Sequence, residues 1–156
     1  MSTTLTAERL ATALPGRWRL GATNLLYWLD ARHGEPLFEF DVVAASPLRL
    51  SETIEFSNPD GTPRMSRGTS RFVGGEFRWR GSGRELVHSR RWTPVGLDDS
   101  ASILVVSCRR TRSVATGMNI LVREGADVGE LRTLVAATAE RLGVSPEEFA
   151  SLTWLS

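Results

Sequence analysis

Lysine is absent from this chain of 156 residues, and cysteine, tyrosine and histidine are scarce, with one Cys, one Tyr and two His. The lone cysteine, Cys108, excludes an intramolecular disulfide. The two histidines are far apart and have no cysteine or carboxylate at ligand spacing, so we expect no metal and no cofactor. The sequence has no nucleophile-elbow, phosphate-loop or dinucleotide motif, and we assign no catalytic residue.

Long apolar runs are missing as well. No stretch of about 18 apolar residues occurs, so we expect no membrane insertion. Residues 1–14 contain no apolar run of signal-peptide length, which favours a cytoplasmic location. All 19 basic residues are arginine and are balanced by 18 acidic residues, which leaves a net charge of +1. A GC-rich coding sequence accounts for arginine in place of lysine, and we expect no nucleic-acid partner.

Short runs of strand type fill the chain up to about residue 124, with turn signals such as Asn58–Gly61 and Gly74–Gly75 between them. An irregular stretch, Asn24–Glu35, follows the first run. The connections are too short for helical crossovers, so neighbouring strands should pair antiparallel. We expect one domain, a mainly β barrel or sandwich of about eight strands. The predicted strands are Trp18–Thr23, Leu37–Ala44, Leu48–Phe56, Met65–Val73, Glu76–Gly81, Leu86–Pro94, Ser102–Arg109 and Met118–Arg123.

Apolar and polar residues alternate within these strands. Phe77 and Trp79, for example, are separated by Arg78, so each strand should have one wet face and one apolar face. In a closed sheet of about eight strands, the apolar faces enclose a space that side chains fill or a small ligand occupies. Arg78 and Arg80 fall on the opposite face and should meet water.

A helical pattern begins near the end of the chain. The capping-box pair at Asp127–Glu130 predicts a helix over about 128–142, and Gly143 supplies its left-handed end. Ser145–Pro146 predicts a short second helix over about 146–151. One face of the first helix is apolar and must pack against the strands. That face consists of Val128, Leu131, Leu134, Val135, Thr138 and Leu142.

Several short motifs resemble those of the bacterial lipocalins. Gly16–Trp18 stands at the start of the first strand, as the Gly-x-Trp signature does in that family. Ile120–Arg123 is similar to their last strand, which ends in an arginine and is followed by a helix. Leu142–Val144 and Leu152–Trp154 resemble the Gly-aromatic segment and the final Ile-Trp that come next. The hairpin around Leu97–Asp98 is similar to their penultimate hairpin, and the match covers roughly the last 65 residues besides the signature.

The resemblance implies a single up-and-down antiparallel β-barrel over residues 1–156, with a C-terminal α-helix packed on it. It also implies that Trp18 closes one end of the barrel and that Arg123 stacks over the indole ring. Two features differ from the family pattern. No tyrosine follows Asp98 closely, and residues 1–14 do not lead us to expect the lipidated signal peptide that is usual in the bacterial members.

In such a barrel the interior is the expected site for one small hydrophobic or amphipathic molecule. Tyr27 and Trp28 fall where a lipocalin has the loop that covers the open end. His88 and Arg90 would hydrogen-bond a ligand if their face of the strand is the inner one, and would meet water otherwise. The interior should be lined by Phe38, Phe40, Phe56, Phe77 and Trp79.

Three functions remain open. The first is non-catalytic binding or carriage of a small apolar molecule by a monomer or homodimer. The second is a cofactor-free cyclase or isomerase, since a shaped cavity can fold a flexible substrate without a strong acid or base. The third is a barrel filled by its own side chains that acts in a protein complex. His33 should be exposed and Cys108 should be a buried small side chain, so neither indicates catalysis.

Overall fold

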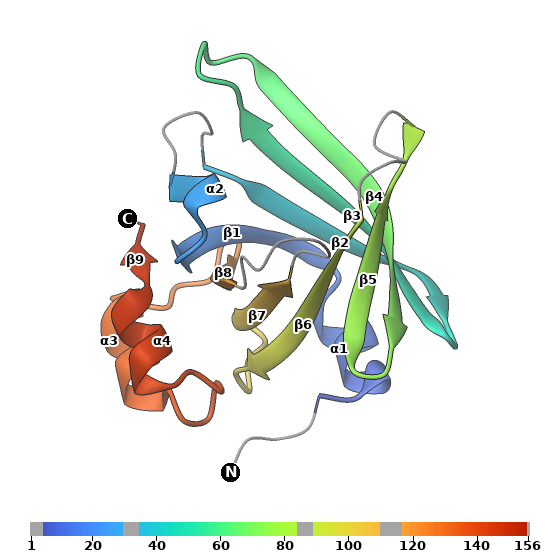
Figure 1. Cartoon of the computed structure of the whole chain (residues 1–156). Helices are drawn as coiled ribbons and strands as arrows, with labels where there is room; N and C mark the ends of the chain where they lie inside the picture. Colours follow the sequence, from blue (N-terminus) through green and yellow to red (C-terminus); the bar gives the residue numbers. More distant parts are fainter. Residues whose placement is uncertain (1–4, 30–34, 84–88, 110–116, 156) are drawn as a thin grey trace.

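The computed structural model describes residues 5–29, 35–83, 89–109 and 117–155, which form a β-barrel with helices around it (Figure 1). Its strands are β1 (Gly16–Thr23), β2 (Leu37–Ala45), β3 (Leu48–Ser57), β4 (Pro63–Val73), β5 (Glu76–Gly81), β6 (Ser89–Leu97), β7 (Ile103–Arg109), β8 (Gly117–Arg123) and β9 (Thr153–Trp154). Its helices are α1 (Ala7–Ala13), α2 (Leu26–Leu29), α3 (Leu131–Thr138) and α4 (Pro146–Ser151).

The barrel is closed. Strands β2 to β8 pair antiparallel in chain order, and β1 pairs with both β8 and β2. This ring of eight strands confirms the predicted up-and-down barrel. The first half of β1, Gly16–Arg19, pairs with β2. Its last residues, Ala22 and Thr23, pair with β9, so β9 covers the part of this edge of β1 that β2 does not reach. Closure leaves no long free edge on the eight strands.

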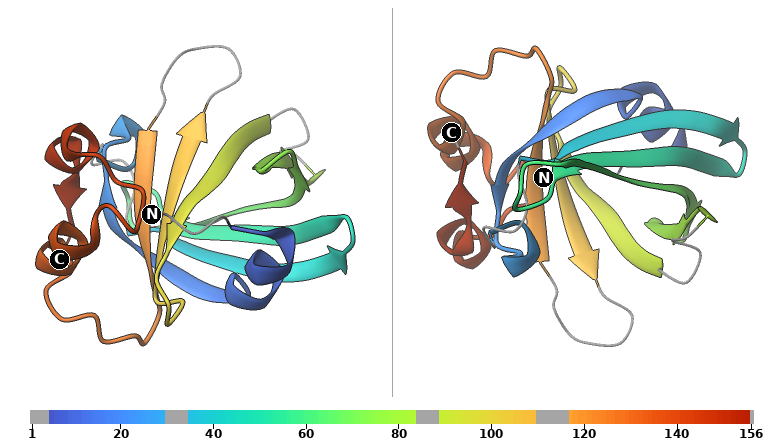
Figure 2. Two further views of the ribbon diagram at one scale, coloured as in Figure 1. Left: turned by 90° about the horizontal axis from the view of Figure 1, so that it is seen from below. Right: turned by 90° about the horizontal axis from the view of Figure 1, so that it is seen from above.

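Alternating side chains build two cores, one inside the barrel and one outside it. The outer core lies between the strands β1, β7 and β8 and the segment of α3 and α4, which lie side by side on that flank (Figure 2). A bulge between Leu20 and Ala22 turns β1 from the inner core to the outer one. The inner core contains Leu10, Leu14, Trp18, Leu20, Phe38, Phe40, Leu48, Leu50, Ile54, Phe56, Phe77, Trp79, Trp92, Leu104, Val106 and Leu121, among others.

One end of the barrel is closed by α1 and by a stacked pair. Trp18 is fully buried, and its Nε1 donates to the carbonyl of Leu14 at 3.0 Å. The guanidinium carbon of Arg123 lies 4.3 Å from the centroid of the Trp18 ring, the arrangement expected from the sequence. The guanidinium also donates to three backbone carbonyls, those of Ala13, Pro15 and Ala101.

The first C-terminal helix is shorter than predicted. α3 begins at Leu131 because Gly129, with φ +63°, breaks the helical path before it. The N-cap is therefore Glu130, which accepts from the Thr133 amide, and not Asp127, which accepts from the Gly129 amide at 3.0 Å. α3 also ends at Thr138 and not near residue 142, because the chain continues in turns up to the left-handed Gly143.

The second helix is as predicted. Ser145 caps α4, Pro146 occupies its first turn, and the side chain of Glu148 reaches back to the Ser145 amide at 2.9 Å. Helix α1, in contrast, was not predicted, although the Thr6 side chain accepts from the Arg9 amide as an N-cap should.

Strand β6 differs most from its predicted range. It was expected over Leu86–Pro94 and runs over Ser89–Leu97, while residues 86–88 lie outside the described part of the chain. The strand continues beyond Pro94 because a bulge between Pro94 and Gly96 restores pairing, with Leu97 opposite Leu104.

The outer face of the barrel carries an unusual row of charge. Five arginines from adjacent strands lie opposite one another in register, namely Arg49, Arg71, Arg78, Arg91 and Arg109. Glu76 pairs with three of them at N–O distances of 3.5 to 4.0 Å. Arg78 and Arg80 are exposed, as the alternation predicted.

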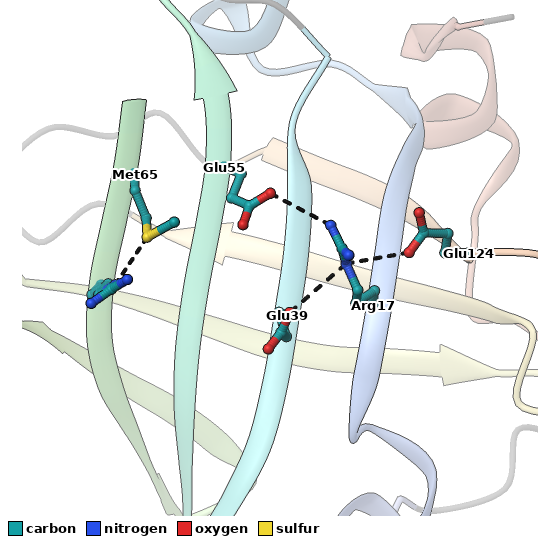
Figure 3. A network of polar contacts seen from close by, with 6 residues as sticks. Arg17, Glu39, Glu55, Met65 and Glu124 are labelled. Atoms are coloured by element: carbon teal, nitrogen blue, oxygen red, sulfur yellow. Dashed lines mark hydrogen bonds and ion pairs between the residues drawn. The ribbon is translucent and has the colours of Figure 1, made fainter. Parts of the chain in front are cut away.

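A second charged network covers the seam where the barrel closes. Arg17 on β1 lies between Glu39 on β2, Glu55 on β3 and Glu124 after β8, at N–O distances of 3.8, 3.5 and 3.3 Å (Figure 3). All four side chains are about half exposed, so the network contributes little to stability. Within the described residues, no helix is long and apolar enough to cross a membrane.

Candidate functional site

The barrel interior collects the aromatic residues that the alternation assigned to it. All five of the predicted lining residues, Phe38, Phe40, Phe56, Phe77 and Trp79, belong to the inner core. Trp28 on α2 packs against this core, with its ring centroid 5.9 Å from those of Phe38 and Phe56. Because α2 follows the end of β1 opposite α1, Trp28 lies at the end of the barrel away from the Trp18–Arg123 pair (Figure 1).

Three residues singled out in the sequence lie outside the described part of the structure. They are His33, His88 and the side chain of Tyr27. Arg90, by contrast, is described, and it lies on the inner face of β6. Its guanidinium carbon is 4.2 Å from the centroid of the Trp79 ring, which shows that this face of the strand points inward.

A polar cluster that was not predicted from the sequence lies among these aromatic rings. Glu52 on β3 is only 5 % exposed, and its Oε2 accepts from the Ser70 hydroxyl at 2.7 Å and from Trp92 Nε1 at 3.2 Å. The second carboxylate oxygen, Oε1, lies 4.0 Å from Arg90 Nη2. The cluster therefore joins β3, β4 and β6 across the inside of the barrel.

Burial decides the electrostatics of this cluster. Desolvation raises the pKa of Glu52 above its ordinary value, and the nearby Arg90 charge and the hydrogen bonds from Ser70 and Trp92 only partly oppose it. A carboxyl in such a place holds its proton to a higher pH than a surface glutamate does. It is a hydrogen-bond acceptor when ionised and also a donor when protonated.

Two buried nitrogen atoms next to the cluster have no hydrogen-bond partner among the described residues. They are Trp79 Nε1 and Arg90 Nη2. The Trp79 indole packs against the backbone of β4 because Gly68 has no Cβ; a Cβ there would stand 2.4 Å from Trp79 Nε1. Buried polar groups in native proteins are almost always hydrogen-bonded, so these two donors are the candidates in the barrel interior for contact with a ligand.

A second, smaller polar group lies on β1, β7 and β8. The Thr23 hydroxyl donates to Asn119 Oδ1 at 2.7 Å, and Asn119 Nδ2 contacts Cys108 Sγ at 3.8 Å. Burial raises the pKa of Cys108 to about 12, so its thiol stays protonated near neutral pH. Cys108 is partly buried and packs against the inner core as a small side chain.

A cavity of about 270 Å³ lies outside the barrel, between the β6–β7 turn and α3. Its carboxylates already have partners within the protein. Asp98 Oδ1 accepts from the amides of Ser102 and Ile103 at 2.7 and 2.8 Å, and Asp99 pairs with Arg141 at 3.0 Å. The described residues contain no group of three or more His, Cys, Asp or Glu that could hold a metal ion. The barrel interior is therefore the stronger candidate site.

Comparison with known proteins gives matches in structure and not in sequence. No family model matches the chain, and no curated protein matches it. The tryptamine complex of the amine-binding protein of Rhodnius prolixus matches 99 % of this chain and 84 % of that protein, with a TM-score of 0.63 and 15 % identity. Lobster apocrustacyanin A1 matches over 98 % and 87 %, with a TM-score of 0.61 and 9 % identity. The bovine lipocalin allergen Bos d 2 matches over 92 % and 93 %, with a TM-score of 0.57 and 12 % identity.

These matches cover 92 to 99 % of this chain and 84 to 93 % of each matched protein, at identities too low to carry a shared function. They agree with the closed ring of eight antiparallel strands. The chain therefore has the lipocalin, or calycin, fold.

Proposed function

We propose that this protein binds one small, largely apolar molecule with a polar end inside the barrel. The observation that carries the proposal is the pair of buried donors that make no hydrogen bond, Trp79 Nε1 and Arg90 Nη2, beside the buried Glu52 carboxyl, whose contact with Arg90 is only a 4.0 Å ion pair. Each unpartnered buried donor costs roughly 1–3 kcal/mol of stability. A bound molecule that accepts from them removes this cost, whereas a purely structural core has no need of such groups.

The rest of the interior supports an apolar body for the ligand. Phe77 stacks on Trp92 with ring centroids 4.3 Å apart, and Phe40 lies 5.6 Å from Trp92. Small-molecule sites are typically apolar and aromatic with few polar groups. The solved protein from Rhodnius prolixus with the same fold holds tryptamine, so the fold is compatible with a small aromatic ligand. Binding, and not catalysis, is the function that this geometry supports best.

Two measurements test the proposal on the full chain. Mass spectrometry of an organic extract of the denatured protein should reveal a co-purified small molecule. Titration with diphenylhexatriene, an apolar fluorophore, should give saturable binding at one site per chain. Absence of both a co-purified molecule and saturable binding would overturn the proposal.

A matched pair of variants locates the site. Phe56→Ala removes a ring inside the barrel beneath Trp28, whereas Glu55→Ala changes the neighbouring outward side chain of the same strand. We expect Phe56→Ala to weaken diphenylhexatriene binding several-fold and Glu55→Ala to leave it unchanged. Equal effects of the two substitutions would place the bound probe outside the barrel.

A further inference from the structure

Among the described residues, the two buried side-chain atoms inside the barrel that lack a hydrogen bond are both donors, and from this we propose that the ligand presents an acceptor oxygen to Trp79 and Arg90 and is not an amine. The acceptor is a carbonyl or a carboxylate on an otherwise apolar molecule. This inference rests on the proposed function and narrows the class of molecule that the same site takes.

The donors are placed to act together. Trp79 and Arg90 are cross-strand partners on β5 and β6, and the guanidinium lies over the indole ring with its carbon 4.2 Å from the ring centroid. Trp79 is 4 % exposed, while the Arg90 side chain is 37 % exposed. A ligand can therefore reach Arg90 from the open end of the barrel and place an oxygen against both residues. Arginine suits this task because its planar fork offers several N–H groups to one carbonyl or carboxylate.

The buried side-chain acceptors described inside the barrel, in contrast, already lie against donors or a positive charge. Glu52 Oε2 receives two hydrogen bonds, from Ser70 and Trp92, and Oε1 faces the Arg90 guanidinium at 4.0 Å. Asn119 Oδ1 accepts from Thr23. A ligand ammonium group, which only donates, would have to take Glu52 away from these partners.

The positive charge of Arg90 also favours a carbonyl or carboxylate over an amine. The Arg90 guanidinium lies 4.0 Å from the Glu52 carboxyl and over the face of Trp79 that a cation would otherwise occupy. An ammonium group at that position would be repelled by the fixed arginine charge in a poorly screened interior. A carboxylate would be attracted, and a neutral carbonyl would accept from both donors without a charge.

A competition experiment with three ligands of similar chain length separates these classes. The ligands are decanoic acid, methyl nonyl ketone and decylamine, each used to displace bound diphenylhexatriene at about pH 7, where the acid is ionised and the amine is protonated. We expect the acid and the ketone to displace the probe at concentrations at least about tenfold lower than the amine does. Displacement by decylamine at equal or lower concentration would overturn the inference.

Variants then assign the selectivity to the two donors. Arg90→Met keeps the apolar stem, and Trp79→Phe keeps the aromatic ring without its N–H. Each should weaken binding of decanoic acid about tenfold, the loss expected for one hydrogen bond to a charged group, and should weaken binding of diphenylhexatriene, which has no acceptor oxygen, by less than that. The control, Arg91→Met, removes the neighbouring arginine that faces outward to Glu76 and should change neither affinity.

These measurements distinguish failure of the acceptor-selective site from failure of ligand binding in the barrel. If diphenylhexatriene binds but Arg90→Met and Arg91→Met behave alike, the acceptor-selective site is refuted while the barrel remains a binding site. If diphenylhexatriene and all three competitors fail to bind, the proposed function itself is refuted, and this inference with it.

Discussion

At the scale of single residues, Glu52 is the side chain with the strongest consequence for stability against pH. Its folded-state pKa lies above the ordinary value of 4.5 because burial outweighs its favourable contacts. The folded protein therefore keeps a proton on Glu52 at pH values where the unfolded chain has released it. The resulting stabilisation is complete below the ordinary pKa and is lost as pH rises through the raised pKa.

Substitution of Glu52 by glutamine tests this dependence. Glu52→Gln keeps an acceptor for Ser70 and Trp92 but cannot ionise, so its free energy of unfolding should not fall over that pH window. We expect the variant to be more stable than the wild type by roughly 1 kcal/mol near neutral pH, with little difference at acidic pH. Urea denaturation between about pH 4 and pH 8 measures this, with the exposed Glu55→Gln as control. A variant that is less stable than the wild type near neutral pH but equal to it at acidic pH would show that the charged carboxylate is stabilising.

Trp18 and Arg123 dominate the closed end of the barrel. Trp18→Ala leaves a large hole beneath the guanidinium and should cost about 3–5 kcal/mol of unfolding free energy. Arg123→Met keeps an apolar cover over the ring but leaves three backbone carbonyls without their donor, so we expect a loss of about 2–4 kcal/mol. Denaturant midpoints measure both, and a change below about 0.5 kcal/mol for either variant would contradict this role.

The sequence contained a signal for Glu52 that the alternation rule does not use. Leu48, Leu50, Ile54 and Phe56 fall on one face of β3, and Glu52 occupies the missing place in that inward row. Apolar alternation identifies the lining of a barrel, so the aromatic residues were predictable from the sequence. Glu52 lies in the same row but was not predicted to face inward, because its partners Ser70 and Trp92 come from other strands. Only the register between strands brings the three together.

At the scale of elements, Gly96 controls how the turns after α3 dock on the barrel. A Cβ at Gly96 would lie 1.9 Å from the carbonyl oxygen of Leu142, a backbone atom that cannot rotate away. Gly96→Ala should therefore cost about 2–3 kcal/mol and loosen α3, seen as faster amide exchange across Leu131–Thr138. Gly125→Ala is the control, because a Cβ at Gly125 would have no atom within 4 Å. Its only expected cost is the left-handed φ of +85°, about 1 kcal/mol. Equal losses for the two variants would contradict the steric explanation.

The arginine row is an arrangement in which like charges oppose one another across neighbouring strands. Arg71 stands between Arg49 and Arg78, and direct cross-strand pairs of like charge are destabilising. We expect Arg71→Thr to stabilise the protein by about 0.2–1 kcal/mol at low ionic strength. The gain should disappear in about 1 M salt, where the screening length is about 3 Å. A gain that does not depend on salt would have to come from strand propensity and not from relief of repulsion.

Elements were predictable to the extent that one local pattern determines them. β5 was predicted residue for residue, because alternation and the Gly74–Gly75 turn both fix it. α3 was misplaced because its capping signal at Asp127 is followed by Gly129, whose left-handed backbone allows a turn where a helix was expected. The end of β6 depends on a bulge next to Gly96, which the contact with Leu142 selects and no local pattern encodes.

At the scale of the whole molecule, we expect the outer core to contribute stability alone and the inner core to bind the ligand as well. The outer core between β7, β8 and the α3–α4 segment is apolar throughout, whereas the inner core contains the Glu52 cluster and the unpartnered donors. A ligand that satisfies those donors binds the folded state alone. Bound at about 100 times its dissociation constant, it should therefore stabilise the protein by about 2.7 kcal/mol.

This division predicts where a ligand acts. Decanoic acid should raise the melting temperature of the wild type, and the rise should be smaller for Arg90→Met at the same ligand concentration. In hydrogen exchange at short times, where local opening dominates, added protection should appear in β5 and β6, which carry Trp79 and Arg90, and in α2, which carries Trp28. Amides of α3 and α4 should exchange unchanged, because these helices contact the outer core. Protection that concentrates in α3 would instead place the ligand in the cavity beside the β6–β7 turn, and the barrel interior would then be a structural core.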